Sequence, residues 1–285
     1  MKTTLLLIAL ASSLSALAQR TSYLCRADGL YDTLGNQLYQ TYSPSACSTA
    51  LTQIRSSRGF FCANDGLRND QGTVIFQTYS PSACTQALTQ ISSNRGYFCA
   101  TDGVRDHQGE VVYQTYSPSD CARALTEISS NRGYFCANDG LRNNEGVLLF
   151  QTYSPSACAQ ALSQISSSRG YFCATDGLRN DQGEVIFQTY SPSACAQAHA
   201  QISSSRGYFC ATDGLRNNQG EVIFQTYSPS ACAQAHTEIS TSRGYFCATD
   251  GLRDRTGTVI HPTYSPSECQ RVLAEVSPRR RRDRD

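Results

Sequence analysis

One pattern of hydrophobic and polar positions repeats along the chain with a period of 37 residues. In the copy at residues 170–206, an apolar run at 171–175 precedes a polar stretch, and a second apolar run at 184–190 follows it. A segment with helical spacing completes the copy. The pattern occurs seven times without a linker, which indicates a tandem repeat protein rather than one large domain.

The two apolar runs of each copy predict a hairpin. Both are rich in strand formers, and the loop between them contains Asn180 and Gly183. The first of these positions is Asn or Asp in every copy and the second is always Gly, whereas the residue at Asp181 varies. Only positions that form the turn are fixed, which favours a structural role for them.

A helix is predicted after the hairpin. Ser191-Pro192-Ser193 is identical in all seven copies, and Ser at the N-cap with Pro at the first helical position is typical of a helix start. The apolar positions from Ala194 to Ile202 then lie on one helical face. Each repeat is therefore expected to be β-β-α, and the fold class to be α+β.

The predicted boundaries begin with a signal peptide at residues 1–18, where a short apolar run precedes a small-residue cleavage site. An Arg-rich tail is expected at 278–285. The repeats are expected at 22–58, 59–95, 96–132, 133–169, 170–206, 207–243 and 244–277.

The 14 cysteines, two in each repeat, predict a disulfide framework. A helix folding back over the hairpin brings Cys195 close to Cys173, whereas pairing with Cys210 of the next repeat requires spanning the helix. Pairing within each repeat is therefore favoured over the alternative between repeats. The expected bonds are Cys25–Cys47, Cys62–Cys84, Cys99–Cys121, Cys136–Cys158, Cys173–Cys195, Cys210–Cys232 and Cys247–Cys269.

A unit below about 40 residues buries too little surface to fold alone without several cross-links. The repeats are therefore expected to pack side by side as an array. The end copies differ as capping repeats do: Tyr31 stands where the others have Arg, and His261-Pro262 lies in the second strand of the seventh copy.

Composition narrows the function. The formal net charge is +1, and Lys2 is the one lysine, so no basic face for nucleic acid is expected. No stretch approaches the ~20 apolar residues of a membrane-spanning helix. Together with the signal peptide, this predicts a secreted, periplasmic or extracellular protein.

Catalytic and metal sites receive little support. Histidine occurs at four positions in the chain, so no catalytic His recurs in every repeat, and neither an enzyme nor a cofactor is expected. A calcium loop from Asp176 to Glu184 is an alternative to the hairpin turn, but Glu184 is replaced in other copies. His199 and His236, one repeat apart where five copies have Leu, leave metal binding open.

Repetition itself suggests binding through many identical sites. The candidate binding face is an Arg that stands six places after the first Cys in six repeats: Arg68, Arg105, Arg142, Arg179, Arg216 and Arg253. The leading hypothesis is an adhesive or structural protein of a cell surface or matrix. The alternatives are a multivalent binder of protein or glycan and a multi-headed protease inhibitor with Arg179 as bait. The partner is an unspecified protein or glycan, and the oligomeric state stays open.

Overall fold

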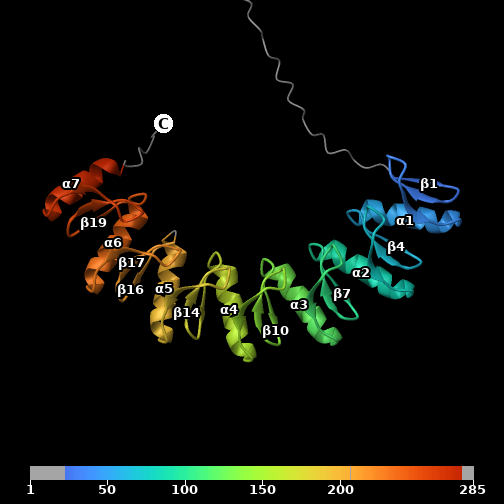
Figure 1. Cartoon of the computed structure of the whole chain (residues 1–285), viewed down its shortest axis with the longest axis horizontal. Helices are drawn as coiled ribbons and strands as arrows, with labels where there is room; N and C mark the ends of the chain where they lie inside the picture. The colour runs from blue at the N-terminus through green and yellow to red at the C-terminus, as the bar shows by residue number, and fades with distance from the viewer. Residues whose placement is uncertain (1–22, 206, 278–285) are drawn as a thin grey trace, which may run out of the picture. The chain divides into compact units, whose positions relative to one another are not determined.

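The computed structural model describes residues 23–205 and 207–277. The predicted signal peptide and Arg-rich tail lie outside these residues and stay predictions. Each repeat forms a three-stranded antiparallel sheet followed by one helix, as Figure 1 shows. The fold is therefore α+β, with seven similar repeats.

The elements recur at equivalent places in every repeat. The first strands are β1 (Leu24–Arg26), β4 (Phe61–Ala63), β7 (Phe98–Ala100), β10 (Phe135–Ala137), β13 (Phe172–Ala174), β16 (Phe209–Ala211) and β19 (Phe246–Ala248). The second strands are β2 (Gly29–Tyr31), β5 (Gly66–Arg68), β8 (Gly103–Arg105), β11 (Gly140–Arg142), β14 (Gly177–Arg179), β17 (Gly214–Arg216) and β20 (Gly251–Arg253).

The third strands are β3 (Gln37–Gln40), β6 (Val74–Gln77), β9 (Val111–Gln114), β12 (Leu148–Gln151), β15 (Val185–Gln188), β18 (Val222–Gln225) and β21 (Val259–Pro262). The helices are α1 (Pro44–Ser56), α2 (Pro81–Ser93), α3 (Pro118–Ser130), α4 (Pro155–Ser167), α5 (Pro192–Ser204), α6 (Pro229–Thr241) and α7 (Pro266–Val276).

The middle strand of each sheet is the one departure from the predicted β-β-α order. In repeat 5, β14 pairs with β13 on one side and with β15 on the other, so that Leu178 lies between Cys173 and Phe187. A three-residue strand is too short to show an alternating pattern, and its Asp-Gly start is a hairpin signal that the sequence interpretation left unused. Glycine is required there: Gly177 has φ 140°, and a Cβ would stand 2.0 Å from the Phe187 carbonyl oxygen.

The predicted turn and helix start are both confirmed. The Asn180 side-chain oxygen accepts the N–H groups of Gln182 (3.1 Å) and Glu184 (2.9 Å), which closes the loop between β14 and β15. At the start of α5, the Ser191 hydroxyl accepts the N–H of Ala194 at 3.3 Å. Asn and Ser therefore stand where their side chains satisfy backbone donors that the strands and helix leave free.

The seven disulfides within repeats are confirmed. Their Cα–Cα distances are 5.8–5.9 Å, inside the usual range for a disulfide. Each bond joins the first strand to the first turn of the helix and spans 22 residues. By the loop-entropy relation, each contributes ~3.4 kcal/mol against the unfolded chain.

Each small core is completed by the following repeat. In repeat 4, Leu141, Phe150 and Ile165 are buried together with Phe172, which belongs to repeat 5. Phe172 is fully buried, and its ring centroid lies 6.2 Å from that of Phe150. Burial of a Phe side chain is worth about 1.5–3 kcal/mol. Neighbouring repeats are therefore coupled through a shared aromatic pair.

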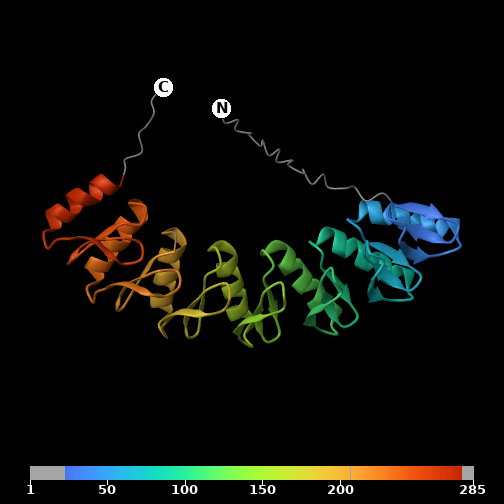
Figure 2. The ribbon, with the colours of Figure 1, turned by 45° about the horizontal axis from the view of Figure 1, so that its top comes forward.

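Backbone contacts divide the chain into two compact units. The first holds residues up to Phe98 together with Asp106–Glu110, and the second holds Cys99–Arg105 together with the residues from Val111 onward. Inside the second unit, α4 packs against β10 and β11 of its own repeat and against β13 of the next, an arrangement that Figure 2 displays. None of the described helices is long and apolar enough to cross a membrane.

Candidate functional site

The predicted Arg face consists of side chains that bond within the protein. In repeat 5, the Arg179 guanidinium makes two bonds to the Asp176 carboxylate (3.1 and 2.6 Å) and also donates to the Gly183 carbonyl. A longer bond of 3.4 Å reaches the carbonyl of Leu149 in the preceding repeat. The Arg179 side chain is 22% exposed. These bonds stabilise the loop before β15 and the contact with the preceding repeat.

The other five Arg residues of the face make the same bidentate ion pair with an Asp three positions earlier. Hydrogen bonding to the Arg side chain lowers the pKa of the carboxyl groups of Asp102, Asp139 and Asp250. Binding of an outside ligand by the face stays a prediction, since the contacts describe only its bonds within the chain.

A second recurring Arg adopts the left-handed backbone conformation after five of the described helices, α1 to α4 and α6. Arg58, Arg95, Arg132, Arg169 and Arg243 have φ between 55° and 61°, and the equivalent Arg206 lies outside the described residues. Such a conformation is uncommon for a residue other than glycine. It ends the helix and turns the chain toward the next first strand.

His199 and His236 bond to backbone carbonyls of their own repeat and of the preceding one, the latter at Gln164 and Gln201. The Nε2 atom of each lies 3.1 Å from a backbone carbonyl oxygen, that of Tyr171 for His199 and that of Tyr208 for His236. Burial lowers the pKa of both imidazoles, and hydrogen bonds to backbone carbonyls oppose that shift. Among the described residues, no group of three or more His, Cys, Asp or Glu side chains is placed to hold a metal ion.

The residues of the calcium-loop alternative are likewise engaged by protein donors. The Asp176 carboxylate pairs with Arg179, and the Asn180 oxygen accepts backbone N–H groups. The oxygens that a calcium ion would need therefore already stabilise the hairpin.

A pocket recurs at the junction between consecutive repeats, and the sequence interpretation did not predict it. At the junction of repeats 5 and 6, Phe187, Ala194, Gln197 and Gln201 line one side, all contributed by repeat 5. The other side comes from repeat 6, through Cys210, Ala211, Thr212, Thr226, Tyr227, Ser228, Pro229, Cys232 and Ala233. The cavity volume is about 210 Å³. We call this cavity and its equivalents the junction pockets.

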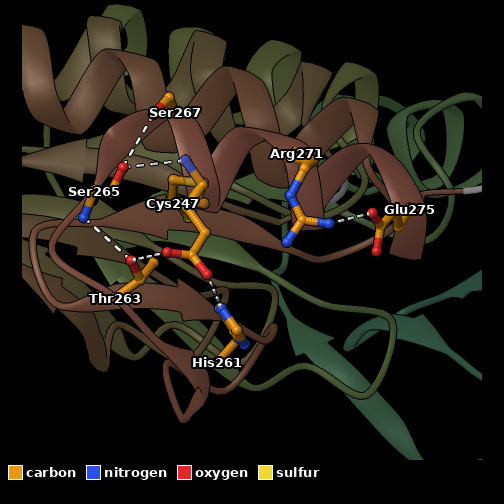
Figure 3. Close-up of polar contacts among 9 residues, drawn as sticks. Cys247, His261, Thr263, Ser265, Ser267, Arg271 and Glu275 are labelled. Carbon is orange, nitrogen blue, oxygen red and sulfur yellow. Dashed lines mark hydrogen bonds and ion pairs between the residues drawn. A yellow bond between two sulfur atoms is a disulfide. The ribbon is translucent and has the colours of Figure 1, made fainter.

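Equivalent junction pockets lie between repeats 1 and 2, repeats 4 and 5, and repeats 6 and 7. Their volumes are about 470, 210 and 200 Å³. At the last of these, Figure 3 shows Thr263 and Ser265 beside Cys247 at the start of α7. The same lining therefore recurs in both units of the chain.

An exposed tyrosine stands at each of the four junction pockets: Tyr79, Tyr190, Tyr227 and Tyr264. These side chains are 77–90% exposed. Three of them are held in place by a glutamine two residues earlier, as where the Gln188 amide donates to the Tyr190 hydroxyl at 3.3 Å. Tyr264 follows Pro262 in place of that glutamine. All four rings are thus presented to solvent, and three of them are bonded through the hydroxyl to a neighbouring glutamine.

The junction pockets also contain the bond that joins consecutive repeats. The Gln164 side-chain oxygen accepts the N–H of Cys173 in the next repeat at 2.7 Å, and Gln201 does the same for Cys210. Every repeat before the seventh has Gln or Glu at this position. This regularity is the signal from which the contact could have been predicted.

The lining of the four junction pockets is uncharged. It combines aromatic rings, alanines and the disulfide with hydroxyl and amide groups. A concave, largely apolar surface with a few directed polar groups is the usual composition of a ligand site. The tyrosine was visible in the sequence as part of an invariant Tyr-Ser-Pro-Ser, but that motif was interpreted only as a helix start.

Comparison with known proteins assigns no family to the chain. Neither a protein-family model, nor a curated protein, nor a solved structure matches it.

Proposed function

We propose that this is an exported protein that binds its target through many identical junction pockets. The observation that carries the proposal is the recurrence of one pocket, with equivalent residues, at four junctions. Each pocket presents a large aromatic side chain that folding leaves in water. An exposed aromatic ring in a fixed position, repeated from copy to copy, is typical of a binding surface.

Multivalency explains why the copies number seven. One pocket of this size makes few contacts and is expected to bind weakly. Linked sites on one chain raise the overall affinity by roughly 10²–10⁴ without any new contact. An adhesive role at a cell surface or in a matrix is the natural use of such a chain. Seven disulfides are typical of proteins from oxidising compartments, which agrees with the predicted signal peptide.

Binding is favoured over protease inhibition and over catalysis. A bait arginine must be free to enter the protease, whereas Arg179 is held by Asp176 and by the Gly183 carbonyl. The sequence also offers no nucleophile and base that recur from repeat to repeat. We therefore propose a binding protein without catalytic activity.

The proposal is tested by retention of the full-length protein on a panel of surfaces: cellulose, mannan, chitin, heparin-agarose, gelatin and a polyproline peptide resin. Tyr190→Ala is made first, and Tyr79, Tyr227 and Tyr264 are then changed to Ala with it. Finally, the equivalent exposed tyrosines of repeats 3 and 4, Tyr116 and Tyr153, are changed as well. On the surface that binds the wild type, retention should fall steeply with each step, about 10²-fold or more for the complete set.

The matched control replaces exposed valines outside the junction pockets, namely Val74, Val185 and Val222, which are 36–42% exposed. Their change to Ala removes exposed apolar surface outside the pockets, less per residue than a tyrosine presents, and should leave retention unaltered. Equal losses in both series, or binding to no surface on the panel, would refute the junction pockets as binding sites.

A further inference from the structure

The chemistry of the junction pockets specifies a class of ligand. We infer that each pocket binds one ring of a neutral saccharide, with the sugar stacked on the exposed tyrosine. This inference rests on the proposed binding function and adds the identity of the target to it: an uncharged polysaccharide or glycan that crosses several repeats.

The composition of the linings favours a neutral ligand. None of the four described linings includes an Asp, Glu, Lys, Arg or His side chain. A charged group entering such a pocket would lose hydration and find only neutral hydroxyl and amide groups in the lining. At the junction of repeats 6 and 7, the nearby Glu238 carboxylate is already bonded to the lining residues Cys247 and Gln270. Charged polymers therefore fit the pockets poorly, and a neutral ligand fits them well.

The junction pockets also combine an apolar floor with polar groups at the rim. At the junction of repeats 4 and 5, the floor includes Phe150, Ala174 and the Cys173–Cys195 disulfide. Gln160 and Thr175 on the rim are exposed and offer an amide and a hydroxyl. A pyranose ring has a face of C–H groups and an edge of hydroxyls, which matches that arrangement.

The exposed tyrosine of each junction pocket is placed where a sugar ring can stack on it. Tyr190 lines the pocket with 77% of its surface exposed, and its hydroxyl accepts a bond from Gln188, which leaves its own proton free to donate. The negatively polarised face of an aromatic ring attracts the positive edge of C–H groups. Tyrosine therefore supplies both a stacking surface and a hydrogen-bond donor.

The size of the site agrees with one ring per repeat. The junction pockets of the second unit measure about 200–210 Å³, below the ~300–1,000 Å³ of sites for drug-sized ligands. A proline-rich peptide is the other neutral ligand that docks on aromatic surfaces, but it requires a groove lined by several aromatic side chains. Each junction pocket presents one exposed ring.

The test is calorimetric titration of the full-length protein with soluble hexaoses of the malto, cello, manno, xylo and N-acetylchito series. At least one should bind, with little change in affinity between low and high salt, because no ion pair forms. Changing all six tyrosines of repeats 2–7 to Ala should abolish the heat of binding. Changing them to Phe should keep most of it, with a loss of about tenfold or less for the missing hydroxyl.

A decamer of proline and a heparin hexasaccharide are titrated in parallel. Tyrosine-dependent binding of the proline peptide, with all hexaoses silent, would uphold binding at the junction pockets and overturn the saccharide. Salt-sensitive binding of heparin alone, unaffected by the Tyr→Ala set but lost in Arg variants, would overturn both and favour the predicted Arg face. If Tyr→Phe abolishes binding as fully as Tyr→Ala, the stacking arrangement is wrong.

Discussion

Repeat 5, inside the array, and repeat 7, the last repeat of this sequence, share one backbone and differ at the surface that faces a following repeat. Repeat 5 presents Phe187, Ala194, Gln197 and Gln201 there, and all four line the junction pocket with repeat 6. The equivalent residues of repeat 7 are His261, Glu268, Arg271 and Glu275. One aromatic, one small and two neutral amide side chains are thus replaced by charged or titratable ones.

In repeat 7, the four side chains at these positions pair with one another. The His261 Nε2 atom lies 3.4 Å from a carboxylate oxygen of Glu268. Arg271 pairs with Glu275 at 2.6 Å, and Figure 3 shows these two side chains side by side. Thr263 also donates to Glu268 at 3.1 Å. The comparison teaches that these four positions serve the contact between repeats. In repeat 5 they are neutral and line the junction pocket, and in repeat 7 they are charged or titratable and paired among themselves. Repeat 3 also has charged residues at three of these positions, Asp120, Arg123 and Glu127, and repeat 6 has Glu238 at the last.

Repeat 1 differs from repeat 6 on the half of the interface that faces a preceding repeat. The position of Ala211, on the other half of the junction pocket, holds Arg26, which lies over the Tyr31 ring at 4.6 Å. Tyr31 replaces the usual Arg and donates its hydroxyl proton to Asp28 at 2.7 Å. Repeats 1 and 7 therefore differ from repeat 5 at opposite halves of the same interface, and a capping role for them stays a prediction.

The largest effect should come from removing the shared phenylalanine. Phe172→Ala empties a fully buried site in the core of repeat 4 and should cost about 3–5 kcal/mol. Leu24 holds the same position in repeat 1 and is 39% exposed, so Leu24→Ala should cost less than about 1 kcal/mol. Urea unfolding of the two full-length variants makes the comparison, and equal losses would show that repeats are not coupled.

The next effect concerns the disulfides. Changing Cys173 and Cys195 together to Ala should cost ~3.4 kcal/mol and open a protease-sensitive point within the array. The same change at Cys247 and Cys269 should leave repeats 1–5 resistant and expose at most repeat 6 with repeat 7, because Phe246 of repeat 7 completes the core of repeat 6. Limited proteolysis with mass spectrometry locates the cuts. Cleavage spread over all repeats in the second variant would contradict nearest-neighbour coupling.

A smaller difference is expected between two kinds of arginine. Arg179→Ala removes a bidentate pair and a carbonyl bond at a partly buried site and should cost about 1–2 kcal/mol. Arg271→Ala breaks the exposed pair with Glu275 and should cost about 0–0.5 kcal/mol. Thermal melts of both variants supply the comparison. If Arg179→Ala melts like the wild type, and changing all six Arg residues of the face to Ala abolishes retention on heparin, the predicted Arg face is a binding site.

The smallest effect depends on pH. Burial lowers the pKa of His199 and His236, so the unfolded chain takes up protons more readily than the folded one. The resulting stability is fully present above the ordinary His pKa of ~6.5 and is lost as the pH falls toward the lower folded-state pKa. Leu stands at this position in the other five repeats.

Changing both histidines to Leu should therefore raise the melting temperature more at about pH 5 than at about pH 8, where His is neutral in both states. Melts of the variant and the wild type at the two pH values check this. An increase of the same size at both would assign the gain to apolar packing alone.

The sequence was sufficient for the features that lie within one repeat. Asn180 and Gly183 marked a turn, Ser191-Pro192 marked a helix start, and the spacing of Cys173 and Cys195 indicated their bond. Each of these depends on residues close in the chain or on a single fold-back. The middle strand β14 was missed because three residues carry no recognisable period.

The candidate site could not be predicted because it forms between repeats. Tyr190 and Gln160 lie in different repeats and become neighbours only when α4 packs against the next sheet. Invariance drew attention to Arg179, which is fixed by its bonds to Asp176 and the adjoining loop. Identity among copies thus indicated importance without distinguishing a residue that supports the fold from one that meets a ligand.

The proposed binding site requires residues from two consecutive repeats. Tyr42 and Tyr190 test it directly, because both are exposed by 75–77% and both accept a bond from a glutamine two residues earlier. Tyr190 lines a junction pocket, whereas Tyr42 lies in repeat 1, which has no preceding repeat in this sequence. The measurement is the number of hexaose molecules bound per full-length chain at saturation. Tyr190→Ala is expected to lower this number by one, and Tyr42→Ala to leave it unchanged. An equal loss in both variants would show that the site lies within a single repeat and not at the junction.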